Sequence, residues 1–260
     1  MKVRDICTLI ENFAPLKLQE DYDNAGLILG DPAAQVKAVL VCLDVSEAVL
    51  DEALEKGCNM VVSHHPLIFR GIKSITGKNP QERTLIKAIQ NKIAIYAGHT
   101  NVDAVMDGVN GKICEKLNLS STAILVPKEN MSNVGAGMTG FLTRALEEKD
   151  FLILLKQVFG SKMLRHSALT GREINKVAVC GGSGSELISA AIAEGADAFI
   201  TADVKYHRFA EVDDKLLLID AGHYETEQFT KDLFVELISK NIANFAVHSS
   251  QRETNPVFYT

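Results

Sequence analysis

The sequence predicts an α/β protein of two related lobes, each a three-layer α/β/α arrangement with a sheet between helices. Three observations predict this fold class. Short apolar runs typical of buried strands alternate with amphipathic segments typical of helices. The strand-helix-strand order favours parallel sheets with right-handed crossovers. The second half of the chain then repeats the pattern of the first half, which indicates an internal duplication.

The first half contains one complete β-α-β unit. A strand is expected over residues 38–43, a helix over 47–56 that ends at Gly57, and a second strand that leads into the pair His64-His65. Neighbouring residues of a strand point to opposite sides, so the two histidines are expected to hold different ions. Helices are also expected over residues 1–13, 81–91, 106–117 and 151–159, with a loop over 68–80 and a strand over 93–97.

The duplication is visible as two runs of matching residues. The segment that begins at residue 176 aligns without gaps on the segment that begins at residue 38, and Gly195 falls on Gly57 at a constant offset (195 − 57 = 138). Residues 120–150 are glycine-rich and are expected to form a connection or edge structure. The duplication predicts a first lobe over residues 1–125 and a second over 126–260, with the C-terminal strands free to return to the first lobe.

A second match places a histidine and an acidic residue after a strand in each half. Ala-Gly-His occurs at His99 and again at His223, and each histidine is followed four residues later by a carboxylate, Asp103 or Glu227. A helix is expected from Tyr224 onward. Ligands of open α/β sheets bind at the carboxyl ends of strands. Two similar lobes are therefore expected to share one site in the cleft between them.

Composition excludes several functional classes. The 260 residues are 47% hydrophobic and carry a formal net charge of −6, which argues against non-specific nucleic-acid binding as the main role. Five widely spaced cysteines, an odd number without a CxxC pair, indicate free thiols in a reducing compartment. The first residues lack the features of a signal peptide, and no apolar run is long enough to span a bilayer. We therefore expect a soluble cytoplasmic protein that does not bind membranes.

Five side chains of metal-binding type stand at the predicted strand ends: His64, His65, Asp103, His223 and Glu227. Imidazole and carboxylate suit zinc, iron, manganese or nickel, and no thiolate is implicated. Three histidines and two carboxylates are too many for one catalytic ion that keeps an open position, and they are about right for two divalent ions. Such a pair of ions activates a water molecule for hydrolysis.

The expected ligand arrangement follows from this count. His64 and Asp103 are placed on one ion and His65 and His223 on the other, with Glu227 between them. Glu227 and His223 share one helix face if the first turn is helical. Glu227 is therefore also a candidate catalytic residue.

Other residues near the predicted strand ends leave alternatives open. His99 is either a ligand or a residue that orients Asp103. His207, with Asp203, is a candidate general acid or base, and the start of a surface helix explains it equally well. Lys205 and Arg208 suit a phosphate, although solvation is the usual fate of such charges. The glycine-rich turn at 181–185 is a weak match to a phosphate cradle and is well explained as a tight strand-to-helix turn.

The motifs SHHPLIF, GHTNVD, TADVKYH, GHYETE and YDNAGLILGD together resemble the GTP cyclohydrolase 1 type 2-like, or Nif-three-like, family over essentially the whole chain. The resemblance implies a dinuclear-metal protein of two related α/β lobes that assembles into a toroidal homohexamer. The metal ligands of the family fall on the same five residues. Tyr22 stands where many relatives have tryptophan, and residues 120–170 are too few for the domain inserted in longer relatives.

Three functional hypotheses follow. The first is a two-metal hydrolase that acts on a nucleotide or another phosphorylated heterocycle; the family name implies opening of the GTP imidazole ring with loss of formate. The second is a non-catalytic metal-handling protein. The third is a ring-shaped binding or regulatory protein in which the metals stabilise the fold. In each case the protein associates with itself, and in the first it also binds a small-molecule substrate.

Overall fold

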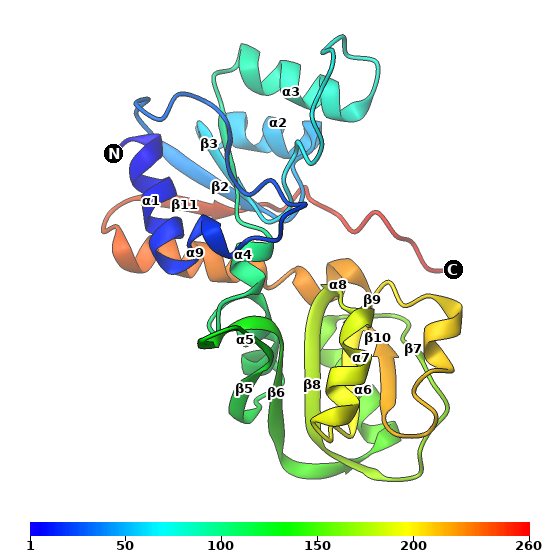
Figure 1. The fold of residues 1–260 in the computed structure, drawn as a ribbon. Helices are drawn as coiled ribbons and strands as arrows, with labels where there is room; N and C mark the ends of the chain where they lie inside the picture. Colours follow the sequence, from blue (N-terminus) through cyan, green and yellow to red (C-terminus); the bar gives the residue numbers. More distant parts are fainter. The chain divides into compact units, whose positions relative to one another are not determined.

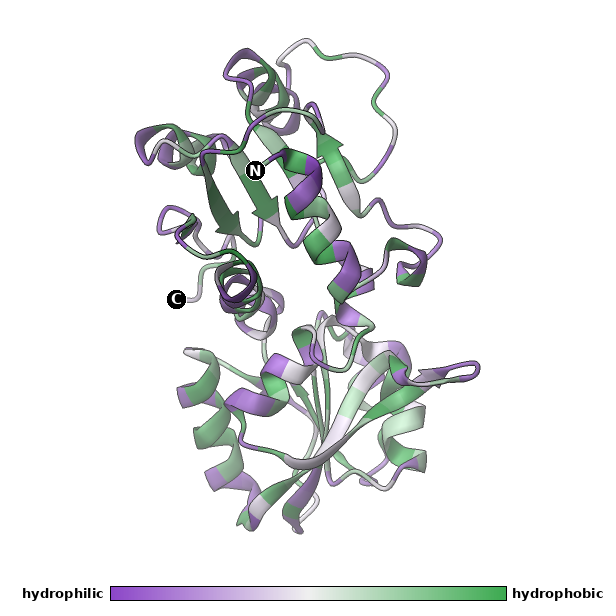
Figure 2. Ribbon diagram, turned by 90° about the vertical axis from the view of Figure 1, so that its left-hand side faces the viewer, coloured by the Kyte–Doolittle hydropathy of each residue, from purple (hydrophilic) through white to green (hydrophobic).

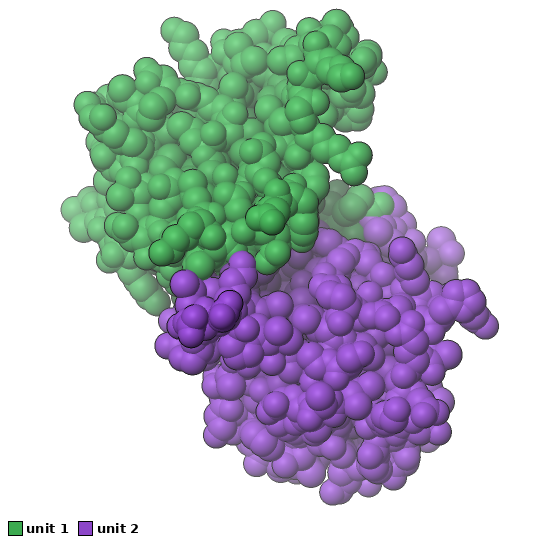
Figure 3. All heavy atoms as spheres, in the orientation of Figure 1, with its two compact units in different colours: residues 1–102, 230–256 green, residues 103–229, 257–260 purple.

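The computed structural model describes all 260 residues and contains two compact units (Figure 1; Figure 3). Unit 1 comprises residues 1–102 and 230–256, and unit 2 comprises residues 103–229 and 257–260. Each unit has one sheet with helices on both faces, which confirms the predicted α/β class with two lobes. The lobe boundary expected at residue 125 concerns the duplicated segments and stays a prediction.

The sheet of unit 1 is mainly parallel and has five strands. In spatial order they are β1 (Gly26–Leu29), β4 (Ala94–Ala97), β3 (Met60–Ser63), β2 (Ala38–Cys42) and β11 (Ala246–Ser249). Only β1 runs antiparallel to its neighbour. The strand β11 comes from the C-terminal end of the chain and pairs with β2, so unit 1 is built from two separate stretches of sequence.

Helices cover both faces of this sheet (Figure 1). The helices α2 (Glu47–Glu55) and α3 (Pro80–Gln90) lie on one face, and α1 (Val3–Phe13) and α9 (Thr230–Asn241) lie on the other. Alternate residues of the strands supply the two cores because neighbouring strand residues point in opposite directions. Leu40, Val61 and Ile95, for example, pack with the inner residues of α2 and α3. Two short elements complete the unit: η1 (Leu16–Leu18) and α4 (Thr100–Asp103), the last residue of which belongs to unit 2.

The sheet of unit 2 has six strands and is mixed. In spatial order they are β5 (Ser120–Lys128), β6 (Met131–Glu147), β8 (Glu173–Ser183), β9 (Ala198–Ala202), β10 (Leu217–Asp220) and β7 (Arg165–His166). The strands β8, β9 and β10 are parallel, whereas β5, β6 and β8 run antiparallel in turn. The helices α5 (Val109–Lys116) and α6 (Glu148–Phe159) pack on one face, and η2 (Ser185–Leu187) and α7 (Ile188–Ala193) pack on the other.

The glycine-rich segment 120–150 differs from its expected structure. Its first strand, β5, is an edge strand as expected, but the segment is a long hairpin and its second strand, β6, lies inside the sheet. The glycines permit close strand pairing: a Cβ at Gly135 would lie 2.1 Å from the carbonyl oxygen of Val126. The helix expected from Tyr224 is also interrupted, because α8 (His223–Glu227) ends three residues before α9 begins.

The helices α2 and α7, which occupy matching positions in the internal duplication, end in the same way. Gly57 and Gly195 follow α2 and α7 with φ values of 70° and 72°, a left-handed conformation that glycine adopts without strain. The amide that follows Gly57 donates to Ala53 O at 2.8 Å, and the amide that follows Gly195 donates to Ala191 O at 3.0 Å. The same 6→1 hydrogen bond thus closes both helices at the same offset in the sequence.

Apolar residues are concentrated in the strands and on the inner faces of the helices (Figure 2). All five cysteines are free thiols, and four of them are buried. None of the helices is both long and apolar enough to cross a membrane.

A buried carboxylate on α2 fixes the chain that follows β11. Glu52 accepts hydrogen bonds from Ser250 Oγ at 2.6 Å, from the amides of Gln251 and Arg252, and from Lys56 Nζ at 2.7 Å. Burial alone raises the pKa of Glu52, but these hydrogen bonds outweigh it and lower the pKa from 4.5 to about 2. The ionised carboxylate therefore stabilises unit 1 at neutral pH.

We expect Glu52→Gln to lower the free energy of unfolding by about 2 kcal/mol at pH 7, because hydrogen bonds to a charged group are lost. The folded-state pKa is depressed, so this contribution is complete above pH 4.5 and is lost as the pH falls toward 2. Urea unfolding at pH 7 and at pH 3 measures both effects. Glu55→Gln is the matched control, because Glu55 pairs with Arg252 at an exposed position of the same helix. Equal losses in the two variants would contradict the prediction.

Candidate metal centre

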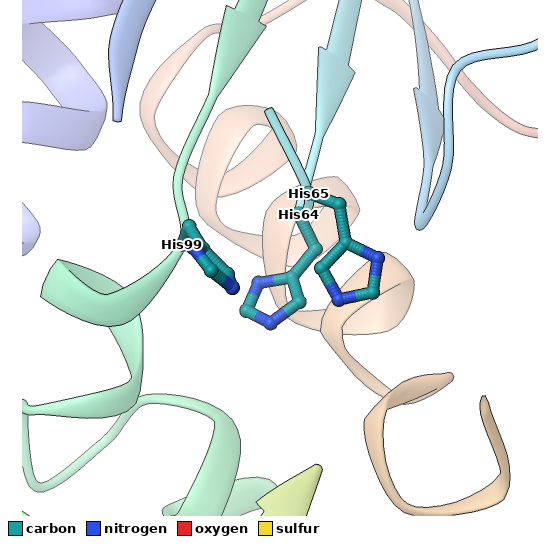
Figure 4. A group of neighbouring side chains, drawn as sticks. All are labelled: His64, His65 and His99. Atoms are coloured by element: carbon teal, nitrogen blue, oxygen red, sulfur yellow. The ribbon is translucent and has the colours of Figure 1, made fainter. Parts of the chain in front are cut away.

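His64 and His65 lie directly after β3, at the carboxyl end of the unit 1 sheet (Figure 4). They were expected to point to opposite sides of an extended strand, and this expectation is wrong. The chain bends after Ser63, whose hydroxyl donates to the carbonyl of His65 at 2.8 Å. The two ring centroids are therefore only 4.9 Å apart. His64 is fully buried and His65 is partly exposed.

His99 joins these two residues from the end of β4. Its ring centroid lies 5.1 Å from that of His64 and 5.4 Å from that of His65. One ring nitrogen from each of the three side chains lies within 4.8 Å of the other two. Figure 4 shows the three rings gathered at the ends of two neighbouring parallel strands. We refer to His64, His65 and His99 as the three-histidine cluster.

Each ring of the cluster is oriented by an oxygen atom at Nδ1. The acceptors are Gly98 O at 2.9 Å for His64, Asp44 Oδ1 at 2.9 Å for His65 and Asp23 Oδ1 at 2.7 Å for His99. A carbonyl oxygen can only accept, so Nδ1 of His64 carries a hydrogen and the Nε2 atom of the neutral ring is its ligand atom. This is the arrangement that orients histidine ligands in metal proteins.

Asp23 is the most strongly held of these acceptors. It accepts hydrogen bonds from the ring of His99 and from both the amide and the hydroxyl of Thr100. Burial alone raises the pKa of Asp23, but these hydrogen bonds outweigh it and lower the pKa to about 2. Asp23 is thus a carboxylate that fixes the position of His99. In the sequence it indicated only a turn, because the contact spans 76 residues.

A second donor set lies in unit 2 on the first turn of α8. His223 Nε2 is 2.9 Å from Glu227 Oε2, as the four-residue spacing predicted. His223 Nδ1 lies 2.7 Å from Asp203 Oδ2, and Ser183 Oγ donates to the same carboxylate. Burial opposes protonation of His223, but Glu227 and Asp203 outweigh it and raise the pKa to about 9. The two carboxylates thus stabilise positive charge at this position, which also favours binding of a metal ion in place of the proton.

The glycine-rich turn at the end of β8 makes room for this second set. Gly182 has a φ of 62°, and a Cβ at this position would lie 2.1 Å from Glu227 Oε1 and 3.3 Å from His223 Cε1. Its amide donates to Thr226 Oγ1 at 3.0 Å. The absence of a side chain at Gly182 therefore leaves the space that Glu227 and His223 occupy. The sequence did not reveal this role of the turn. Ser183 adds the hydrogen bond to Asp203 that helps to position His223.

The remaining predicted residues are placed as follows. Asp103 is the last residue of α4, is half-buried, and accepts a hydrogen bond from Asn110 Nδ2 through its backbone carbonyl at 3.1 Å. His207 is exposed on η3 (Tyr206–Phe209), and its ring lies 5.2 Å from that of Tyr206. Its role as an acid or base stays a prediction. Arg208 of the same element is paired with Glu211.

These features define a class of protein: an α/β protein in which each unit carries at least one imidazole group, with its Nδ1 atom fixed, at the carboxyl end of its sheet. Unit 2 adds a carboxylate ligand atom. Such donors bind divalent transition metals.

Comparison with known proteins identifies the family. The chain belongs to the Duf34/NIF3 (NGG1p interacting factor 3) family, whose model matches residues 1–256. It is 37% identical over 229 residues to a Clostridium acetobutylicum protein named GTP cyclohydrolase 1 type 2 homolog, and the match covers 87% of this chain and 85% of that protein. A Lactococcus lactis protein of the same name is 32% identical over 269 residues, with 99% of each chain covered.

A solved structure agrees with these matches. The crystal structure of a Bacillus cereus protein related to NIF3 matches with a TM-score of 0.91 and 25% identity, covering 100% of this chain and 99% of that one. The family predicted from the sequence motifs is therefore confirmed.

Proposed function

We propose that this chain binds two divalent metal ions and hydrolyses a nucleotide or another phosphorylated heterocycle. The ligands of the proposal are those expected from the sequence: His64, His65, Asp103, His223 and Glu227. The observation that carries it is the orientation of the histidines, because an oxygen atom at Nδ1 holds each of them. Glu227 supplies the carboxylate that we place between the two ions.

The donor chemistry fits this metal assignment. Imidazole nitrogens and carboxylate oxygens without thiolates suit zinc, iron, manganese or nickel. Burial keeps the nearby thiol of Cys180 protonated, because loss of water and the charges of Asp103, Glu186 and Glu227 raise its pKa. A bound pair of divalent ions would lower the pKa of a water molecule and polarise the bond to be broken.

The protein's own residues have separate roles in this proposal. Asp44 and Asp203 orient His65 and His223, so they are positioning residues rather than catalytic ones. Glu227 would supply the carboxylate shared by two bound ions, and His207 is the proposed proton donor or acceptor for the leaving group. From the resemblance of the sequence motifs to the family we also propose a toroidal homohexamer in the cytoplasm as the working form of the protein.

The name of the relatives selects the first substrate to test, which is GTP. We expect metal-reconstituted protein to release formate from GTP, and Glu227→Gln to lower this rate at least about tenfold, because the amide keeps the shape but loses the charge. Formate release and the ultraviolet spectrum of the product are the readouts. Glu236→Gln, which changes a carboxylate paired with Lys240 on α9, is the control.

The outcomes of this experiment separate the functional hypotheses. Formate from the wild type, with loss only in Glu227→Gln, would support the hydrolase. Two bound ions without turnover on GTP or on other phosphorylated heterocycles would contradict it and leave metal handling as the function. Equal rates in the wild type and Glu227→Gln would remove Glu227 from the proposed mechanism.

A further inference from the structure

The loop between β3 and α3 carries a concentration of positive charge in an otherwise acidic protein. Ten of the residues between Phe69 and Glu82 line a pocket of about 400 Å³, and three of them have cationic side chains: Arg70, Lys73 and Lys78. Glu82 is the only acidic residue of the lining, so the local net charge is +2, whereas the whole chain carries −6. No function described above uses this loop.

The one carboxylate of the pocket stabilises the loop itself. Glu82 is only 4% exposed and accepts hydrogen bonds from the amide and hydroxyl of Thr76, the amide of Lys78 and Nδ2 of Asn79, at 2.8 to 3.2 Å. Hydrogen bonding from Thr76 is the largest cause that lowers the pKa of Glu82 to about 2. The segment therefore has a defined shape although residues 69–79 contain no helix or strand.

The cations of the pocket are available to a ligand. Arg70 and Lys73 are exposed and form no ion pair. Lys78 Nζ is 3.6 Å from Glu82 Oε1, a long contact to a carboxylate that already accepts four closer hydrogen bonds. A phosphate group binds well to a guanidinium and two ammonium groups in such a pocket, because the guanidinium can donate two parallel hydrogen bonds.

The pocket lies next to the three-histidine cluster. Phe69, which is 40% exposed, lines the pocket, and its ring centroid lies 6.1 Å from that of His99. The ring of Phe69 also contacts that of Tyr22, with 6.2 Å between the two ring centroids. Phe69 therefore connects the three-histidine cluster with the cationic pocket. Aromatic side chains of this kind stack on heterocyclic bases.

We infer that the loop 69–82 is a phosphate-binding site for an aromatic phosphate ester, with the phosphates on Arg70, Lys73 and Lys78 and the heterocycle beside Phe69. The assignment of the ester as the substrate rests on the proposed function, whereas phosphate binding by the loop does not. A heterocycle beside Phe69 is also next to the three-histidine cluster, where the proposed reaction occurs. The loop would thus select phosphorylated compounds over the free nucleoside.

Isothermal titration of the full chain with inorganic pyrophosphate, GTP and guanosine tests this inference. The protein is used both metal-loaded and after chelator treatment, because phosphate groups also bind metal ions. We expect Arg70→Ala/Lys73→Ala to weaken pyrophosphate and GTP binding at least tenfold in both preparations and to leave guanosine binding unchanged. The wild-type affinity is expected to fall as salt is added. Arg144→Ala/Lys149→Ala is the matched control, because it removes the same two charges from exposed positions of unit 2.

Two results would overturn the inference: absence of saturable pyrophosphate binding by chelator-treated wild type, or an equal loss of affinity in the two double variants. Failure of the proposed hydrolase has a different signature. In that case formate release is absent from the metal-loaded wild type, while the tenfold difference in pyrophosphate affinity between wild type and Arg70→Ala/Lys73→Ala remains.

Discussion

Replacing Gly182 by alanine is expected to reduce metal affinity and turnover about 100-fold, because the added methyl group would occupy the position of the Glu227 carboxylate. A Cβ on Gly182 would lie 2.1 Å from Glu227 Oε1, so the carboxylate must move, and His223 Cε1 at 3.3 Å leaves little space for it. Displacement of a ligand or of its hydrogen-bonding partner costs 10- to 100-fold in affinity or activity, by order of magnitude. Zinc titration and formate release measure the two effects.

Gly160→Ala separates this steric effect from backbone strain. Gly160 ends α6 with a φ of 63°, nearly identical to the 62° of Gly182, but a Cβ at Gly160 meets no atom within 4 Å. Backbone strain should cost both variants about 1 kcal/mol of stability, because alanine is disfavoured in the left-handed region. Only Gly182→Ala should lose metal. A similar loss of metal in Gly160→Ala would show that destabilisation alone explains the result.

His64→Asn is expected to remove at least one metal ion per chain and to lower metal affinity by more than about 100-fold, since loss of a ligand exceeds the effect of losing its hydrogen-bonding partner. Asparagine is chosen because its amide nitrogen can keep the hydrogen bond to Gly98 O that Nδ1 of His64 now makes. The buried position is therefore not left with an unsatisfied carbonyl. Metal content after dialysis, measured by mass spectrometry, is the readout.

His166→Asn is the control for this variant, because His166 is an exposed histidine on β7 outside both donor sets. Thermal unfolding of the metal-free proteins shows whether His64→Asn damages the fold itself. If His64→Asn retains the wild-type metal content, His64 is not a ligand and the assignment of the unit 1 site must be revised.

Much of the fold followed from local patterns in the sequence. The unit around Gly57 was predictable because apolar strands, an N-cap and a helix-ending glycine are all local signals, and Gly195 repeated them. The segment 120–150 is harder to predict, because several glycines in a short segment are typical of a loose connection. In the structure they permit close contact between β5 and β6, which depends on a partner strand and cannot be read from the segment alone.

The candidate site was predictable as a set of residue types but not as an arrangement. Repetition of His-x-x-x-[Asp/Glu] identified His223 and Glu227, and the structure places their ligand atoms 2.9 Å apart. The orientation of His64 and His65 was predicted wrongly, because a bend after Ser63 brings their rings together. Asp23 escaped notice, since its contact with His99 joins residues that are 76 positions apart and no local pattern encodes it.

The pairing of β11 with β2 has a consequence for the biosynthesis of this protein. Most of unit 1 precedes unit 2 in the chain and is synthesised before it, yet its sheet is completed only by residues 246–249 and by the hydrogen bonds of Glu52 to the chain that follows them. Until then β2 is an edge strand that is paired only with β3, and its other edge is open to association with other nascent chains. Almost all of unit 2 is synthesised as one continuous stretch in the meantime, so the second unit can fold before the first is complete. Premature termination near residue 240 would therefore damage the N-terminal part of the protein more than the middle.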